Sequence, residues 1–385
     1  MNRFTAIGKI SFNKETSKYP FYREGKTKEG KTKDGQTKKS RTYKSLNLNV
    51  APEKSNRINA DIFGMITDVI KANDKDGNKI EIAWADRADD GVLGNVANYC
   101  TTNINLSDDW DARKTFLSAY DAIDYIRDHK DEMEGQTLAV SGRLRKDVYN
   151  GKARDRFEIQ SIYVPNSDAK AGIKLTIDFF WKKDGVDISE FEKNKKIYFD
   201  GYVEVYIDGK NQYVPQRIMF DCSKIDFDNE KHMQAFLFRL SSMNLAYENG
   251  KIVNKARSSK VYAQQIEISY FNGAEEVEFD ESQLTPYQKQ MVDMGLKKLS
   301  DFRPAGQAYG DRITIYKIVN FTAHGAYAEG CVEWGDAGDF EDAIYVAPVE
   351  EESLASAMNA PVAKDNADVS EESDDDEGEA EDWFN

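Results

Sequence analysis

Apolar and polar residues alternate with a period of two along much of this chain, and this alternation restricts the fold more than any other feature. Phe4, Ala6 and Ile10 share one parity, while Arg3 and Lys9 lie on the other. The pattern recurs in residues 46–50 and 138–144. A period of two is typical of strands with one side in a core and the other facing solvent or a ligand. We therefore expect a mainly β protein with a few helices, an α+β fold class.

The order of elements in residues 1–165 narrows the fold further. Strands come first, with a hairpin turn at Asp76-Gly77, and an amphipathic helix is expected over about 112–130. A second hairpin follows, turning at Asn150-Gly151. A closed five-stranded barrel with a helix between its third and fourth strands has this order, which is the oligonucleotide/oligosaccharide-binding (OB) architecture. We therefore expect an OB-fold barrel in residues 1–165. The apolar face of the helix contains Phe116, Tyr120, Ile123 and Ile126.

A second β-rich domain is expected over 173–348, after a polar linker at 165–172. Residues 173–179 and 203–207 alternate, and Thr285, Pro286 and Gln288 form the signature of a helix N-terminus. The strand and turn from Gly142 to Lys152 resemble those from Gly201 to Lys210. A duplicated, OB-like barrel is one interpretation of this short echo.

The net charge of −16 is distributed unevenly along the chain. Residues 1–50 contain 13 basic and 4 acidic residues, a net charge of +9. Residues 350–385 contain 14 acidic residues and one lysine, a net charge of −13. Because such a segment has little apolar surface and repels itself, we expect residues 349–385 to form a disordered acidic tail. The overall acidity therefore does not argue against a polyanion-binding face elsewhere.

A basic loop at 18–44 is the first candidate binding element. Its cations can neutralise phosphates, and its flanking aromatic rings can stack on unpaired bases. In an OB barrel the first loop often lines the binding groove. A solubilising loop without a ligand is the alternative. The cations are Lys18, Arg23, Lys26, Lys28, Lys31, Lys33, Lys38, Lys39, Arg41 and Lys44, and the aromatics are Tyr19, Phe21, Tyr22 and Tyr43.

The hairpin at 143–157 is the second candidate, and a charged exterior hairpin without a ligand is an equal alternative. Phe63 and Trp84 fit apolar strand parities, so we expect them in the core rather than as platforms for bases. Tyr202 and Tyr206 lie on a polar strand face, where a binding role is conceivable. The predicted DNA-binding residues of the hairpin and of the first strand are Arg143, Arg145, Tyr149, Lys152, Arg154, Arg156, Arg3 and Lys9.

The acidic tail ends in two large aromatic residues that its own composition cannot bury. Acidic side chains can steer an approach to a partner protein, and aromatic side chains can fill a pocket on it. We therefore favour a docking peptide over a tail that only improves solubility. The tail is also expected to compete with nucleic acid for a basic groove. The predicted partner-binding residues are Asp374, Asp375, Asp376, Glu381, Asp382, Trp383 and Phe384.

Several classes of function lack a signature in this sequence. Cys100, Cys222 and Cys331 are far apart, which argues against a disulfide framework and for a reducing compartment. We find no Cys/His metal spacing, phosphate-binding Gly-rich loop or nucleophile elbow. No apolar run of a signal peptide or membrane span is present. We expect a cytoplasmic, non-catalytic protein without a cofactor or bound metal.

Four segments together resemble a known family, the single-stranded DNA-binding proteins of the replication type. They are Met1-Asn2-Arg3-Phe4, Val140-Ser141-Gly142-Arg143-Leu144, Phe157-Glu158-Ile159 and the acidic end with Trp383-Phe384. The resemblance covers residues 1–165 and 371–385. It implies protection of unpaired DNA during replication, recombination and repair, and recruitment of replication and recombination proteins by the tail.

This chain also departs from the short bacterial form of that family. Asn385 follows the terminal aromatic pair, the first loop is longer and richer in lysine, and the second β-rich region has no counterpart. These departures point towards a bacteriophage version, which would act in the host cell cytoplasm. Other interpretations remain open. One is a phage recombination nuclease with a metal site assembled from carboxylates, and another is a single-stranded RNA-binding protein or a purely protein-interaction module.

Overall fold

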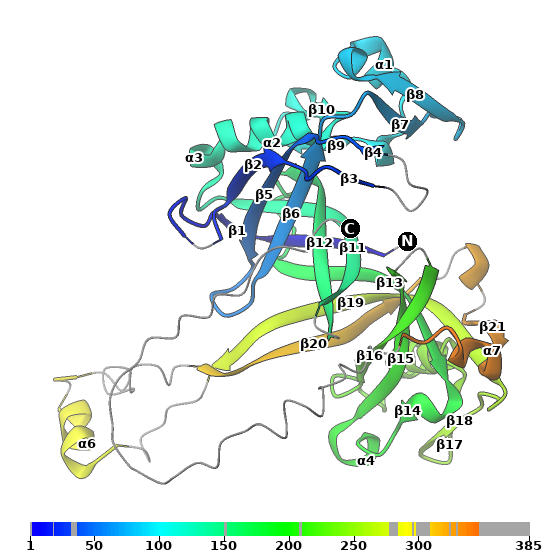
Figure 1. Ribbon diagram of the computed structural model, residues 1–385. Coiled ribbons are helices and arrows are strands. Elements are labelled where there is room, and N and C mark those ends of the chain that lie inside the picture. Colours follow the sequence, from blue (N-terminus) through cyan, green and yellow to red (C-terminus); the bar gives the residue numbers. More distant parts are fainter. Residues whose placement is uncertain are drawn as a thin grey trace, which may run out of the picture.

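A computed structural model describes most of the chain and shows a mainly β protein with a few short helices, as the alternation predicts (Figure 1). The predicted tail at 349–385 lies outside the described residues. The described residues are 2–17, 19–31, 37–149, 152–207, 210–276, 284–294, 296–297, 309–322, 325–328 and 330–345.

Five strands in the first half pair in a closed ring, which we call the first barrel. The first strand pairs antiparallel with the second and with the fourth. The second and third strands are antiparallel, as are the fourth and fifth, and the third and fifth are parallel. Because every strand has two neighbours within the ring, the sheet closes on itself. The strands are β1 (Arg3–Ser11), β5 (Thr42–Ala51), β6 (Ile58–Met65), β11 (Thr137–Tyr149) and β12 (Lys152–Tyr163).

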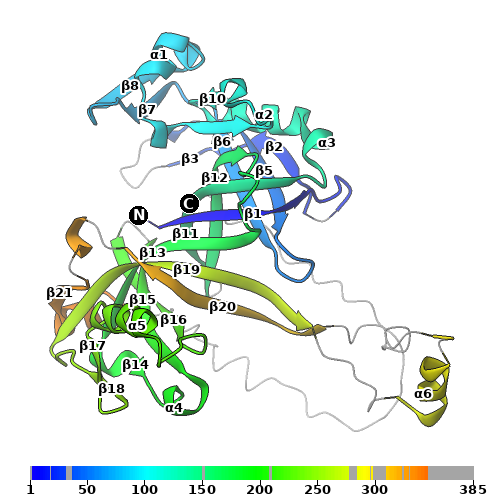
Figure 2. The ribbon, with the colours of Figure 1, turned by 180° about the vertical axis from the view of Figure 1, so that it is seen from behind.

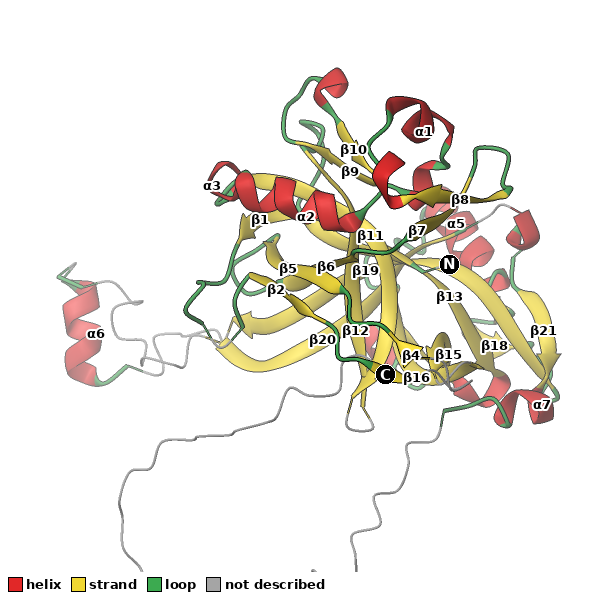
Figure 3. Ribbon diagram, turned by 45° about the horizontal axis from the view of Figure 1, so that its top comes forward, coloured by secondary structure: helices red, strands yellow, loops and turns green. Residues whose placement is uncertain are grey.

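Helix α2 (Ala119–Asp128) lies over one end of the first barrel, between its third and fourth strands (Figure 3). Ile123 and Ile126 are buried as predicted, but the helix does not begin at 112. The Ser118 side chain accepts a hydrogen bond from the Tyr120 amide and caps the helix there. Phe116, which was expected on the helix, instead lies in the short strand β10. Residues 114–116 pair with β9 and are not available to the helix, so the helix starts later than its periodicity indicates.

Five strands in the second half form another closed ring with the same order, which we call the second barrel. Its third and fifth strands are again parallel, meeting at Met219 and Lys317, and helix α5 (Glu230–Ser241) again lies between the third and fourth strands. The other four pairings are antiparallel. The strands are β13 (Gly172–Lys182), β15 (Lys196–Ile207), β16 (Lys210–Asp221), β19 (Lys260–Glu276) and β20 (Tyr309–Phe321).

The repeated strand order shows that the predicted echo between the two halves aligned the wrong elements. Gly142 lies in the fourth strand of the first barrel and Lys152 in the fifth. Gly201 lies in the second strand of the second barrel and Lys210 in the third. The predicted turns at 150–151 and 208–209 lie outside the described residues. The similarity reflects the shared geometry of two hairpins, so it does not mark equivalent positions.

The two barrels are joined through their first strands. β1 pairs antiparallel with β13 over five positions, from Arg3 opposite Thr176 to Ile7 opposite Gly172. The two strands run side by side in both views of the ribbon (Figures 1 and 2). The rings of Phe157 and Tyr270, one from each barrel, also meet at 5.6 Å. A single cluster of buried apolar side chains consequently extends through both barrels.

Smaller elements lie around the two barrels. Gly77, at φ +87°, makes the predicted turn between β7 and β8, and Thr285 and Gln288 form the predicted capping box at the start of α6. The other described strands are β2 (Tyr22–Lys26), β3 (Gly30–Lys31), β4 (Thr37–Lys38), β7 (Val69–Asn73), β8 (Lys79–Ala83), β9 (Thr102–Asn105), β10 (Lys114–Phe116), β14 (Val186–Asp187), β17 (Leu245–Glu248), β18 (Lys251–Asn254) and β21 (Val332–Asp336). The other described α-helices are α1 (Asp90–Asn95), α3 (Lys130–Met133), α4 (Phe191–Asn194), α6 (Pro286–Asp293) and α7 (Ala337–Glu341).

Candidate nucleic-acid interface

An aromatic pair lies on the outer surface of the first barrel, where its second and third strands run side by side. The rings of Tyr43 on β5 and Phe63 on β6 stack with centroids 5.5 Å apart and planes 29° apart. Both are half-buried and share the outward parity of Asn47 and Asp61, which face each other across the two strands. We call the surface formed by these four residues the β5–β6 face. Phe63 is therefore not the core residue that its parity predicted.

A glycine in the neighbouring strand makes room for the Tyr43 ring. Gly25 on β2 pairs with Tyr43, and a Cβ at this position would lie 2.9 Å from the Tyr43 hydroxyl. The tyrosine ring thus lies against the backbone of β2 at Gly25 and also against Phe63. This packing holds one face of an aromatic pair at a defined place on the barrel surface.

Exposed cations surround this pair, but the segment that carries them is not the irregular loop that was expected. Residues 22–26 form β2, which pairs antiparallel with the first half of β5, and β3 pairs with β4. Lys18 and Lys33 lie outside the described residues, as do the side chains of Lys31 and Lys38. Tyr19 is exposed near the start of this segment. The exposed cations are Arg23, Lys26, Lys28, Lys39 and Arg41.

Two predicted binding residues, Phe21 and Lys44, are buried, so these predictions were wrong, whereas Tyr22 is half-buried and its predicted role stays a prediction. Phe21 is only 2% exposed and packs edge-on against Phe12. Lys44 is 7% exposed because it shares the inward parity of Leu46. The Tyr22 hydroxyl donates to Glu24.

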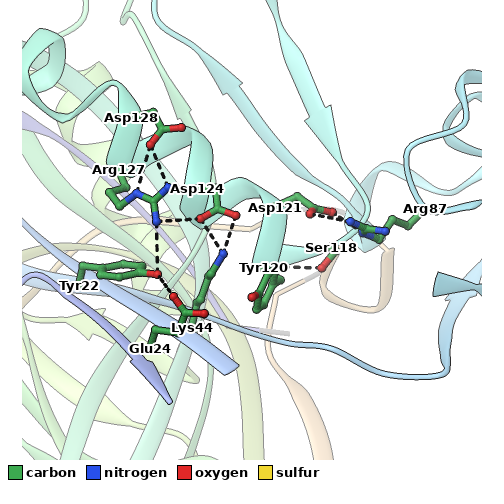
Figure 4. A network of polar contacts seen from close by, with 10 residues as sticks. All are labelled: Tyr22, Glu24, Lys44, Arg87, Ser118, Tyr120, Asp121, Asp124, Arg127 and Asp128. Atoms are coloured by element: carbon green, nitrogen blue, oxygen red, sulfur yellow. Dashed lines mark hydrogen bonds and ion pairs between the residues drawn. The ribbon is translucent and has the colours of Figure 1, made fainter. Parts of the chain in front are cut away.

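Helix α2 supplies the partners that hold Lys44 and Tyr22 (Figure 4). The Lys44 ammonium lies 2.7 Å from both carboxylate oxygens of Asp124 and 3.9 Å from the centre of the Tyr120 ring. Burial opposes the charge on this ammonium, but hydrogen bonds to Asp124 and Tyr120 outweigh it and raise the pKa of Lys44. Arg127 donates to the Tyr22 hydroxyl and pairs with Asp124 at 3.2 Å. These polar contacts fix the start of β5 to α2.

The β11–β12 hairpin presents its arginines on the same outer surface, but carboxylates partly neutralise them. Arg156 forms a two-pronged hydrogen bond with Asp61 of β6, and this contact, opposed by burial, raises the arginine's pKa. Arg145 pairs with Glu158 at 2.8 Å. Arg154 is exposed, and the side chains of Tyr149 and Lys152 lie outside the described residues. The hairpin is therefore closer to a charged, internally paired surface than to a purely basic groove.

A cleft of about 500 Å³ adjoins the aromatic pair. Arg41 and Phe63 line it together with Lys71 of the β7–β8 hairpin and Trp84. Trp84 is half-buried and packs under the Arg87 guanidinium at 4.4 Å, so it is neither fully in the core nor a free platform. The sequence did not single out the β7–β8 hairpin as a wall of the site, because its strands carry no unusual cluster of charge.

The other predicted residues lie elsewhere. Arg3 and Arg143 face each other across β1 and β11, beside a groove between the two barrels, and Lys9 is exposed towards the far end of β1. In the second barrel, Tyr202 packs against Phe340 of α7, whereas Tyr206 is exposed.

No group of three or more His, Cys, Asp or Glu side chains in the described part of the chain is arranged to hold a metal ion. The three cysteines are free thiols. None of the helices that the structure describes is both long enough and apolar enough to cross a membrane. No protein-family model matches the chain, and no curated protein is significantly similar to it in sequence.

Proposed function

We propose that this chain is a non-catalytic protein that binds single-stranded DNA with little sequence preference, using the β5–β6 face of the first barrel. Under this proposal both barrels are OB folds, in residues 1–165 and 173–348. The supporting feature is the ring order: first, second, third, fifth and fourth strand, with a parallel third–fifth pair and a helix before the fourth strand. OB barrels bind oligonucleotides on their second and third strands, between the first and last hairpin loops.

The observation that carries the proposal is the stacked pair of Tyr43 and Phe63 on those two strands, flanked by exposed cations. Stacking of a base on an aromatic ring contributes about 1–3 kcal/mol and tolerates any base. Lysine and arginine contacts to phosphates add affinity that does not depend on sequence. Because duplex bases are already stacked on each other, this arrangement favours an unpaired strand.

The biological role is proposed from the family resemblance. The protein would protect unpaired DNA during replication, recombination and repair, and its acidic tail would recruit other proteins through Trp383 and Phe384. Such a role needs high affinity without sequence preference, which stacking and phosphate contacts provide together.

The test is a titration of the full chain with fluorescent oligothymidylate, its RNA counterpart and a duplex, each at several salt concentrations. We expect tight, salt-sensitive binding to the single-stranded DNA and much weaker binding to duplex. The double variant Tyr43→Ala, Phe63→Ala should lose affinity for the single strand. Tyr287→Ala, which removes an exposed tyrosine from α6, is the matched control and should bind normally.

Equal affinity for single strand and duplex would overturn the proposal, as would unaltered binding by the double variant. Stronger binding to the RNA oligomer would redirect it to single-stranded RNA.

A further inference from the structure

A groove of about 1020 Å³ lies between the two barrels, away from the β5–β6 face. Its floor is formed by outward residues of β1, β11 and β13, so it spans the junction of the two first strands. Residues 98–113, which contain β9, supply part of its wall. None of the residues that line the groove also lines the cleft beside Phe63.

Two aromatic side chains in this wall are largely exposed. Tyr99 is 52% exposed and Trp110 is 64% exposed, although both line the groove. The Arg113 guanidinium lies 5.0 Å from the centre of the Trp110 ring, on one side of it. Large aromatic side chains contribute most to stability when buried, so their exposure in a concave surface points to a ligand. Hydrogen bonds from Arg143 and Gln160 to the Tyr99 carbonyl position this segment.

The groove is strongly basic. Five cations line it against a single carboxylate, that of Glu267. Within the described part of the chain, none of these five cations forms an ion pair with a carboxylate. The Nε atom of Arg143 is buried and has no hydrogen-bond partner among the described residues. The five cations are Arg3, Arg113, Arg143, Lys170 and Lys174.

This charge pattern differs from that of Arg145 and Arg156 in the β11–β12 hairpin, which pair with Glu158 and Asp61. Like charges that gather in a groove without counterions repel one another and create a positive potential. A polyanion removes that repulsion by replacing condensed counterions with phosphate contacts. Exposed aromatic rings next to such cations suit a strand whose bases are unstacked.

We propose that this groove is a second track for single-stranded nucleic acid. Arg3, Arg143 and Lys174 contact phosphates, and Tyr99 and Trp110 stack with bases. The inference rests on the proposed function, and it extends the bound strand beyond the β5–β6 face. Arg143 and Arg145 share a parity on β11 and are two residues apart, about 7 Å along a strand. A nucleic-acid strand that leaves the β5–β6 face therefore crosses β11 at these two arginines and enters the groove.

The experiment uses the full chain and two lengths of oligothymidylate. One is roughly 10 nucleotides, within the span of a single OB barrel, and the other is long enough for many proteins to bind. The groove variants are Tyr99→Ala with Trp110→Ala, and Arg3→Glu with Lys174→Glu. We expect both to bind the short oligomer normally on the β5–β6 face. On the long strand each should occupy fewer nucleotides per protein. The charge variant should also make the slope of the logarithm of the binding constant against the logarithm of salt concentration shallower, by about 0.7 per cation removed.

Tyr287→Ala with Lys289→Glu, an exposed aromatic and cation in α6, is the matched control and should behave as wild type on both oligomers. An unchanged site size and salt dependence in the groove variants would overturn the inference while leaving the proposed function intact. Failure of the wild-type chain to bind any single strand would instead overturn the proposed function.

Ultraviolet crosslinking of the wild-type chain to the long strand provides a measurement that does not depend on variants folding. Crosslinks should appear in peptides from residues 98–113 as well as from β5 and β6. Their absence from residues 98–113, with crosslinks present at β5 and β6, would contradict a track through the groove. If an acidic peptide, rather than DNA, binds at Tyr99 and Trp110, the groove is a protein-docking site and the inference is wrong.

Discussion

Lys146 and Asp155 face each other across the β11–β12 hairpin and form an ion pair of 2.8 Å, with side chains only 6% and 5% exposed. The same ammonium donates to Gln216 of β16 at 2.7 Å, and the Tyr316 hydroxyl of β20 donates to Asp155. Burial, with the Asp155 charge as the next cause, raises the pKa of Tyr316. A hairpin of the first barrel is thus anchored to two strands of the second by a buried polar cluster.

Asp155→Asn is expected to destabilise the protein strongly. It leaves the Lys146 ammonium buried without its counterion, which typically costs about 3–5 kcal/mol. The double variant Lys146→Met, Asp155→Leu removes both charges and should lose less. Asp200→Asn breaks the exposed pair with Arg217 and should change the unfolding free energy by at most about 1 kcal/mol. Denaturant unfolding measures all three. A small effect of Asp155→Asn would show that the cluster does not hold the barrels together.

Lys44 and Arg41 lie three residues apart, but changing Lys44 should affect stability whereas changing Arg41 should affect DNA binding. Lys44→Met removes a buried partner of Asp124 and should lower the unfolding free energy by about 1–3 kcal/mol, with DNA affinity unchanged. Arg41→Glu alters an exposed cation and should weaken DNA binding and its salt dependence, with stability nearly unchanged. Paired unfolding and binding titrations check both. Loss of affinity in Lys44→Met at a temperature where it is fully folded would restore Lys44 to the binding surface.

Gly25→Val tests the position of the Tyr43 ring without touching either aromatic residue. The new side chain would occupy the space of the Tyr43 hydroxyl and push the ring away from Phe63. We expect DNA binding to weaken by about the stacking of one base, about 1–3 kcal/mol. Gly30→Val in β3 is the control, because a Cβ there has no neighbour within 4 Å. Anisotropy titrations should separate the two variants, and equal affinities would argue that the aromatic pair does not contact bases.

The stability of the second barrel should fall in acid through Asp221. Burial opposes its charge, but hydrogen bonds from Lys317 and Ser223 outweigh it and lower the pKa of Asp221 from 3.8 to about 2. A depressed folded-state pKa stabilises the fold above the unfolded value, and this stabilisation is lost as pH falls from 3.8 to about 2. Asp221→Asn should therefore be less stable than wild type near neutral pH and should approach it near pH 2. A difference in unfolding free energy between Asp221→Asn and wild type that stays the same at every pH would contradict this assignment.

Local patterns predicted the strands well because parity depends only on neighbours along the chain. Phe4, Leu46 and Leu48 are buried as their alternation indicates, and Gly77 makes the turn expected of Asp76-Gly77. Lys44 was misassigned although it lies on the buried parity of β5, because the partner that compensates its charge is Asp124, a residue 80 positions away that only the folded α2 brings close. The same holds for Phe21, whose cover comes partly from Lys130 of α3.

The groove between the barrels was missed for a related reason. Tyr99, Trp110 and Arg113 lie in a segment without a clear period, and part of that segment was included in the predicted helix. All three line a groove whose other walls come from strands distant along the chain, such as β12 and β13. Arg3 and Arg143, on the polar parity of predicted strands, are the groove residues that the sequence predicted to bind DNA.

The pairing of β1 with β13 has a consequence for synthesis on the ribosome. Among the described strands β1 emerges before its partners β11 and β13, which begin only at Thr137 and Gly172. Until those residues leave the exit tunnel, the backbone amides and carbonyls of Arg3–Ile7 have no strand beside them. An open strand edge is a template for pairing with other chains. Because such long-range pairing is slow, nascent copies on neighbouring ribosomes are exposed to mispairing through β1, and a chaperone that shields this edge would raise the yield of folded protein.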